Sequence, residues 1–129
     1  MNQCDSKISA ALRSRIRGLK ATGENEYACV VEFDPDFTGF AGHFEGNPIV
    51  PGVCLIEAAR VIAEEATATQ LRTTQIAQCR FRRPVCAGEN VDATLKITDS
   101  ETSGVRNIRA DLRVGGATAA QMRLEVQPL

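Results

Sequence analysis

Two side chains that can move protons lie close together in one stretch of the sequence, between Gly39 and Ala66. His43, the only histidine of the chain, lies in a loop rich in glycine and proline, and imidazole titrates near neutral pH, where a general base works best. Glu57 follows in a run with helical spacing that begins at Gly52. Free N–H groups at the start of that helix would polarise a carbonyl. A base, a carboxylic acid and a carbonyl clamp favour proton abstraction beside a carbonyl, with a leaving group elsewhere.

Both side chains also have a purely structural interpretation. His43 could brace a tight loop, although Phe44 beside it would supply an apolar wall that excludes water. On a helical wheel, Glu57 lies with Arg60 and Glu64, opposite the apolar stripe of the helix. It could therefore belong to a solvated face with an ion pair to Arg60, or serve as a second proton-handling group if a partner surface covers it.

Other chemistries fit the sequence less well. Cys54 lies beside Leu55 in the apolar part of the helical run, which argues against a catalytic thiol. No serine occupies a nucleophile-elbow pattern, and no glycine loop matches a phosphate cradle. One histidine and scattered cysteines do not supply the usual ligand set of a zinc site, so we expect neither a metal nor a cofactor.

The elements that position these residues can be predicted from apolar spacing. Residues 6–20 combine helical spacing with alternation, and we expect a short helix or arm followed by a strand from about Arg15. The one clear helix runs from Gly52 to about Ala66, with Pro51 just before its start. Period-2 alternation predicts strands at about 27–33, 75–82, 91–97, 108–114 and 120–126.

The connections complete the predicted fold. Residues 67–74 are polar and predict a connecting segment, and Gly115-Gly116 is typical of a two-residue hairpin. Hairpins imply an antiparallel sheet, whose apolar face needs a cover, and the single long helix is the only candidate. We therefore predict an α+β fold with five to six strands and one long helix.

Composition indicates an ordinary globular protein. A length of 129 residues is near the usual size of one domain, so we expect residues 1–129 to form a single domain. The net charge of −1 gives no electrostatic reason to expect binding to nucleic acid or to an anionic membrane. Residues 1–20 lack the apolar core of a signal peptide. Five cysteines without a C-x-x-C pair favour core thiols and a reducing cytoplasm.

Two segments of the chain have the form of signature motifs. The first segment reads Gly42-His43-Phe44-x-Gly46-x-Pro48-Ile49-x-Pro51-Gly52-Val53-x-x-x-Glu57-Ala58. The second reads Cys79-Arg80-Phe81-Arg82-Arg83-Pro84-Val85-x-x-Gly88. Both resemble the motifs of 3-hydroxyacyl-[acyl-carrier-protein] dehydratases of the FabA/FabZ type. The order and separation of the two segments match those of the family, and together they anchor about residues 27–98.

The resemblance implies a fold, an assembly and a reaction. The fold is the hotdog fold, a strongly bent antiparallel sheet wrapped around a long central helix, and the assembly is a dimer with two active sites at its interface. His43 would remove the C2 proton of a 3-hydroxyacyl thioester on acyl carrier protein, and Glu57 would handle the leaving hydroxyl, giving a trans-2-enoyl thioester. The Gly52 N–H would hold the thioester carbonyl, and the Ile49 carbonyl would fix the tautomer of His43. The residues implied in substrate binding are Phe44, Ile49, Pro51, Gly52 and Val53.

Three arginines precede Pro84, namely Arg80, Arg82 and Arg83. They could form the polar face of a strand. The resemblance implies instead that they dock the acidic surface of an acyl carrier protein, where electrostatic steering raises the association rate more than the affinity.

The sequence departs from the family pattern at two positions. Glu45 stands where the family usually has proline, and Val61 replaces a glutamine that is common one helical turn after the acid. These departures leave open a non-catalytic acyl-binding subunit paired with an active paralogue. A hotdog acyl-thioesterase, which would use a carboxylate to activate water, is a second alternative. His43 beside Phe44 argues against the thioesterase, and glutamate at position 57 resembles the simple dehydratases that do not isomerise the double bond.

Overall fold

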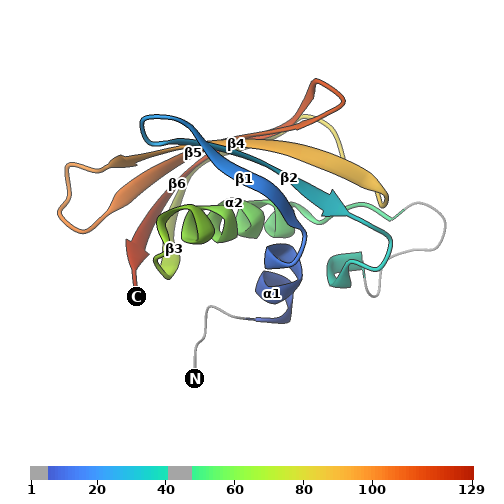
Figure 1. The fold of residues 1–129 in the computed structure, drawn as a ribbon, viewed down its shortest axis with the longest axis horizontal. Coiled ribbons are helices and arrows are strands. Elements are labelled where there is room, and N and C mark those ends of the chain that lie inside the picture. The colour runs from blue at the N-terminus through green and yellow to red at the C-terminus, as the bar shows by residue number, and fades with distance from the viewer. Residues whose placement is uncertain (1–5, 41–47) are drawn as a thin grey trace.

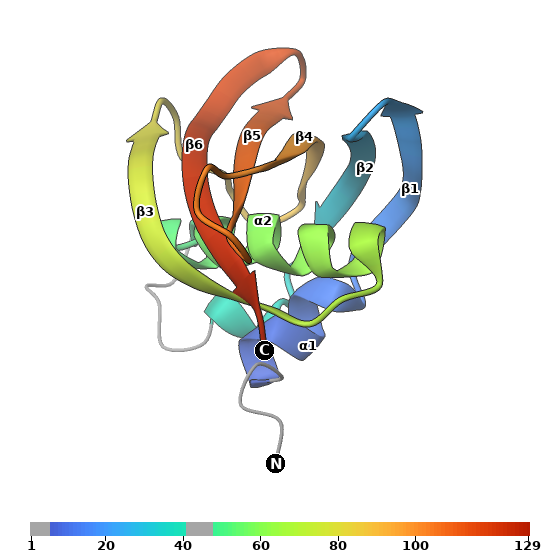
Figure 2. The same cartoon turned by 90° about the vertical axis from the view of Figure 1, so that its left-hand side faces the viewer.

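The computed structural model describes residues 6–40 and 48–129. Within these residues, six strands form one antiparallel sheet in the order β1-β2-β4-β5-β6-β3, which curves around the helix α2 (Figure 1 and Figure 2). The strands are β1 (Ile16–Gly23), β2 (Glu26–Phe33), β3 (Leu71–Phe81), β4 (Glu89–Asp99), β5 (Arg106–Val114) and β6 (Ala117–Pro128). The helical elements are α1 (Lys7–Arg13), a short 3-10 helix (Thr38–Phe40) and α2 (Gly52–Thr67).

The N-terminal segment forms a short helix and then a strand, as predicted. The side chain of Ser6 caps α1 by accepting a hydrogen bond from the Ser9 N–H at 3.1 Å. Strand β1 begins at Ile16, directly after the helix ends, and pairs with β2. Besides α2, the structure therefore has a second helix, which lies against α2 on the side away from the sheet (Figure 1).

Helix α2 occupies the concave side of the sheet. Pro51 precedes it, and Ala68 ends it in the left-handed conformation. Leu55, Ala59 and Ile62 are at most 2% exposed and belong to the core. The predicted helix and its apolar stripe are confirmed.

The three C-terminal strands carry the alternation that the sequence predicts. Inward residues such as Leu95, Ile108 and Leu124 are buried, while their neighbours along each strand are mostly exposed. Gly115 and Gly116 both have positive φ, at 58° and 84°, and join β5 to β6. This is the backbone that a tight hairpin requires and that glycine adopts most easily.

Strand β3 begins earlier than predicted, at Leu71 and not at Gln75. Its start is polar and was mistaken for a connection, but Leu71 is buried and pairs with Pro128 of β6. As an edge strand, β3 is hydrogen-bonded on one side only, and residues 74–78 are all exposed. The described part of the chain covers neither face of this middle section, so the alternation there does not correspond to burial.

Four of the cysteines lie in the described part of the chain, and all four are free thiols. Cys29 and Cys54 are buried, as predicted, whereas Cys79 and Cys86 are partly exposed. Among the described residues, no helix is both long and apolar enough to cross a lipid bilayer.

Candidate functional site

Part of the predicted site lies outside the described residues. His43 and Phe44 fall in the segment 41–47, as does Glu45. The described part comprises the chain from Pro48 to the first turns of α2, together with the second motif at the end of β3.

The two motifs meet in space through backbone hydrogen bonds. The Val50 N–H donates to the Val85 carbonyl at 2.7 Å, and the Ala87 N–H donates to the Pro48 carbonyl at 3.0 Å. Between these two bonds, Ile49 forms an antiparallel bridge with Cys86. The second motif therefore holds the segment that leads into α2, and it fixes where the helix begins.

The start of α2 has backbone N–H groups with no partner among the described residues. Pro51 offers no side-chain cap, and its carbonyl accepts from the N–H groups of Cys54 and Leu55. Within residues 6–40 and 48–129, nothing accepts a hydrogen bond from the N–H of Gly52 or Val53. These N–H groups, at the positive end of the helix dipole, suit a carbonyl oxygen or another partial negative charge.

Exposed apolar side chains surround this helix start. Ile49 is 44% exposed, Val53 is 67% exposed and Phe81 is 52% exposed. The Phe81 ring packs directly on Gly52, since a methyl group there would lie 2.7 Å from the ring Cζ. We call Ile49, Val53 and Phe81 the apolar rim. Phe81 was not predicted as a site residue, although its place in the second motif was a signal.

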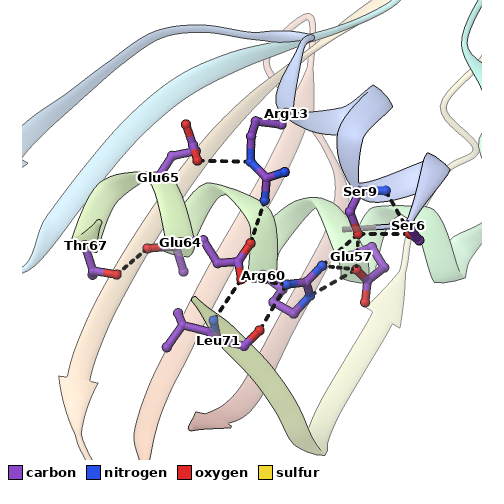
Figure 3. Close-up of polar contacts among 10 residues, drawn as sticks. Ser6, Ser9, Arg13, Glu57, Arg60, Glu64, Glu65, Thr67 and Leu71 are labelled. Carbon is purple, nitrogen blue, oxygen red and sulfur yellow. Dashed lines mark hydrogen bonds and ion pairs between the residues drawn. The ribbon is translucent and has the colours of Figure 1, made fainter. Parts of the chain in front are cut away.

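Glu57 lies in the second turn of α2, and its side chain is 33% exposed. Its Oε2 atom accepts from Arg60 Nη2 at 2.6 Å and from Arg60 Nε at 3.0 Å (Figure 3). The Ser9 hydroxyl of α1 lies 3.4 Å from the same oxygen. The ion pair between Glu57 and Arg60 is confirmed, and Glu57 is only partly open to solvent.

The prediction that this polar face of α2 is exposed to solvent is wrong for Arg60 and Glu64, which follow Glu57 along the helix. The side chains of Arg60 and Glu64 are each 4% exposed, and they form an ion pair at 2.9 Å. Helix α1 lies over this face, and Arg13 from α1 pairs with Glu64 at 2.8 Å (Figure 3). A helical wheel identifies a polar face, but it does not reveal that a second helix covers that face.

The other residues of interest on α2 belong to the core. Val61, which departs from the family pattern, is fully buried. Burial raises the pKa of the Cys54 thiol, and the negative charge of Glu57 raises it further. The thiol is therefore the predominant form at neutral pH, which agrees with the expectation that Cys54 is not a nucleophile.

The three arginines of the second motif differ in their surroundings. Arg80 and Arg82 are exposed, while Arg83 is partly buried. Arg83 Nη2 binds both carboxylate oxygens of Glu89, at 2.9 and 3.1 Å. Arg83 therefore has a structural role in the turn between β3 and β4, whereas Arg80 and Arg82 remain accessible to a partner.

The hydrogen bonds that Arg83 and the Cys86 N–H donate to Glu89 predict that the stability of the fold depends on pH. The backbone N–H of Cys86 lowers the pKa of Glu89, and the Arg83 guanidinium lowers it further. A carboxylate whose pKa is lowered in the folded state stabilises the fold at pH values above its ordinary pKa of 4.5. That contribution is lost as the pH falls through the folded-state pKa. We expect the free energy of unfolding to fall as the pH drops below 4.5, and to fall less steeply in Glu89→Gln. Denaturant titrations across that range test this, and equal slopes would contradict it.

Comparison with known proteins identifies the family. A model of the ApeI-like family, described as ApeI dehydratase, matches residues 20–113. The chain belongs to the ApeI dehydratase family. The FabZ 3-hydroxyacyl-[acyl-carrier-protein] dehydratase of Rhizobium etli is 33% identical over 110 residues, covering 80% of this chain and 70% of that protein. The FabZ of Rickettsia felis is 29% identical over 129 aligned positions, covering 92% of this chain and 79% of that protein.

Solved structures of similar shape confirm the hotdog fold of this ApeI-like chain. The dehydratase heterocomplex ApeI:P from Xenorhabdus doucetiae aligns with a TM-score of 0.69 at 22% identity, covering 87% of this chain and 96% of that one. An acyl-CoA hydrolase from Staphylococcus aureus aligns with a TM-score of 0.57 at 17% identity, covering 85% of this chain and 66% of the hydrolase chain. The fold is thus shared by proteins described as dehydratases and as hydrolases, so the reaction has to be argued from the site.

Proposed function

We propose that this protein dehydrates 3-hydroxyacyl thioesters carried on acyl carrier protein to trans-2-enoyl thioesters, as a single domain in a reducing cytoplasm. The observation that supports this most directly is the hydrogen-bonded junction of the two motifs at the start of α2, with Glu57 in the second turn. The junction places a helix start that suits a carbonyl oxygen on the same helix as the Glu57 carboxylate.

In the proposed reaction, the thioester carbonyl accepts a hydrogen bond from the Gly52 N–H, which stabilises negative charge that develops on the oxygen. His43 removes a proton from C2, the C2=C3 double bond forms, and the C3–O bond breaks. Glu57 delivers a proton to the leaving hydroxyl, which departs as water. The apolar rim and Phe44 contact the acyl chain or the pantetheine arm, and Pro51 holds the helix start in place.

The edge of the sheet supports assembly into dimers. Within residues 6–40 and 48–129, no strand pairs with the outer edge of β3, and β3 exposes Ile76 at 50% and Phe81 at 52%. Long exposed edges with apolar side chains favour pairing with another strand. A second copy that pairs through β3 would cover these side chains and bring partner residues towards the start of α2. We propose a homodimer whose sites combine residues of both chains, with Glu57 facing the partner's His43.

Arg80 and Arg82 are the proposed docking residues for the acidic carrier protein. Arg80 lines a surface hollow of about 350 Å³ together with Arg109 and Arg123, which face each other across β5 and β6, and with one carboxylate, Asp111. Three arginines and one aspartate leave the hollow with a surplus of positive charge, and the like charges of Arg109 and Arg123 directly opposite each other are unfavourable. This arrangement suits an acidic partner.

We expect Arg80→Glu combined with Arg82→Glu to raise KM for carrier-bound substrate about tenfold or more, with little change in kcat and little effect on a small thioester mimic. The effect should weaken as salt screens the exposed charges. Arg72→Glu, a single charge reversal at the other end of β3, is the control for each of the two substitutions made alone and should behave like the wild type. Equal losses on carrier-bound and small substrates would mean that these arginines do not dock a carrier.

One assay separates the proposed activity from its alternatives. The wild-type protein is mixed with a 3-hydroxyacyl or a trans-2-enoyl thioester, and the enoyl absorbance and the free thiol are followed together. A dehydratase changes the enoyl absorbance in both directions and releases no thiol. Thiol release with an unchanged acyl chain would identify a thioesterase. Absence of both signals, with tight binding of the acyl thioester, would identify a non-catalytic subunit.

A further inference from the structure

Hydrogen bonds between α1 and α2 connect Ser9 and Arg60 to the carboxylate of Glu57, which the proposed function uses as the acid. Arg60 lies at the centre of these bonds, and its side chain is 4% exposed. We propose that Arg60 and Ser9 are positioning residues that fix the Glu57 carboxylate for the reaction. This inference rests on the proposed function and extends it to two residues on different helices.

The contacts of Arg60 use the whole guanidinium. Nε and Nη2 both donate to Glu57 Oε2, and Nη2 also donates to the Ser9 hydroxyl at 2.9 Å. Nη1 donates to the Leu71 carbonyl at 3.0 Å and pairs with Glu64 Oε2 at 2.9 Å. A planar guanidinium held on several sides has one orientation, so it presents its two donors to Glu57 in a fixed direction.

Ser9 extends this arrangement into α1. It is 1% exposed, its hydroxyl accepts from Arg60, and it lies within 3.4 Å of Glu57 Oε2. Ser6, the cap of α1, lies 3.1 Å from the Ser9 hydroxyl and also accepts the Ser9 N–H. The position of Ser9 is thus set by the first turn of α1, and α1 becomes part of the site that holds Glu57 (Figure 3).

The two carboxylate oxygens of Glu57 are distinguished by their hydrogen bonds. The hydrogen bonds from Arg60 and Ser9 described above end on Oε2. In the proposed arrangement Oε1 serves the substrate, and the side chain, though 33% exposed, cannot rotate without breaking the bonds to Arg60. A catalytic group held in this way loses less conformational freedom when the substrate binds.

Arg60 also links α2 to Glu64 and to the start of β3, so a purely structural role has to be separated from a positioning role. Arg60→Ala would leave Glu64 buried with fewer partners and could fail to fold. Arg60→Lys keeps the charge but cannot reproduce the fork of donors, and Ser9→Ala removes one hydroxyl only. Glu65→Gln is the matched control, because it removes the 3.1 Å ion pair with Arg13 between the same helices, about two turns away from Glu57.

The experiment measures kcat, KM and melting temperature for the wild type and the three variants with a small 3-hydroxyacyl thioester. We expect Arg60→Lys to lower kcat about 10- to 100-fold with KM changed less than about twofold, because misplacement of Glu57 affects the transition state more than binding. Ser9→Ala should lower kcat about three- to tenfold, the effect of one hydrogen bond. Glu65→Gln should keep the wild-type kcat. If Arg60→Lys and Ser9→Ala change only the melting temperature, as Glu65→Gln does, the positioning role is wrong while the proposed function stands.

A nitrogen-15 spectrum of the arginine Nε–H groups gives a readout that does not depend on turnover. In the wild type, the Arg60 Nε–H should exchange slowly with solvent, and its resonance should move in Glu57→Gln and in Ser9→Ala but not in Glu65→Gln. Rapid exchange in the wild type would overturn the inference. A wild-type protein without activity on any acyl thioester would overturn both the inference and the proposed function, which distinguishes that outcome from a failure of the positioning role alone.

Discussion

His43→Ala should lower the rate of dehydration and of the reverse hydration by about 10²–10⁴-fold, the usual contribution of general-base catalysis. Alanine leaves no group that can take the C2 proton, while the Gly52 N–H and Glu57 remain in place. The loss should therefore appear in kcat with a smaller change in KM. Initial rates with a trans-2-enoyl thioester measure it directly.

His43→Gln is the matched control for this substitution, because it keeps a polar side chain of similar reach but no titrating imidazole. It should be as inactive as His43→Ala, and circular dichroism and melting temperature should show that both variants are folded. Activity within a few-fold of the wild type in either variant would remove His43 from the mechanism. Such activity would favour the thioesterase or the non-catalytic subunit.

Mixing two inactive variants should restore activity if each site is built from two chains. In a dimer of one His43→Ala chain and one Glu57→Gln chain, one site carries both substitutions and the other carries neither. Random reassociation makes about half of the dimers mixed, and half of their sites are intact, so about a quarter of the wild-type sites should return. Glutamine at position 57 still accepts hydrogen bonds from Arg60, so the fold is preserved.

The control for this experiment is independent evidence that the subunits exchange, from mass spectrometry of chains with different tags. The quarter of restored activity should appear at the same rate as the mixed dimers. If exchange is complete and the activity stays at the level of the two variants alone, each site lies within one chain. The proposed pairing across β3 would then have no part in catalysis.

The fold was predicted well where burial follows the sequence pattern. The apolar stripe that includes Leu55 and Ile62 predicted α2, and strict alternation predicted β4, β5 and β6. The start of β3 was missed because the residues that follow Leu71, from Arg72 to Thr74, are polar and resemble a connection. Leu71 is buried by its place beside α2 and β6, which only the folded chain reveals.

The candidate site was predicted in part. Spacing along the helix predicted the ion pair of Glu57 with Arg60, and the glycine and proline pattern predicted the helix start at Gly52. The burial of Arg60 was missed, because it depends on α1, which is distant in sequence. Ser9 has no local signal at all, since its role follows from a contact between two helices. The position of His43 relative to Glu57 remains a prediction.

Hydration of a trans-2-enoyl thioester in D₂O tests the central claim most directly. A dehydratase that works through C2 proton transfer must, in reverse, place one deuterium on C2 and a hydroxyl on C3 and leave the thioester bond intact. Mass spectrometry and proton NMR of the product should show a 3-hydroxyacyl thioester with a single deuterium at C2, formed by the wild type and not by His43→Ala or Glu57→Gln. An unchanged enoyl chain, or a free carboxylic acid and a free thiol, would contradict the proposed reaction.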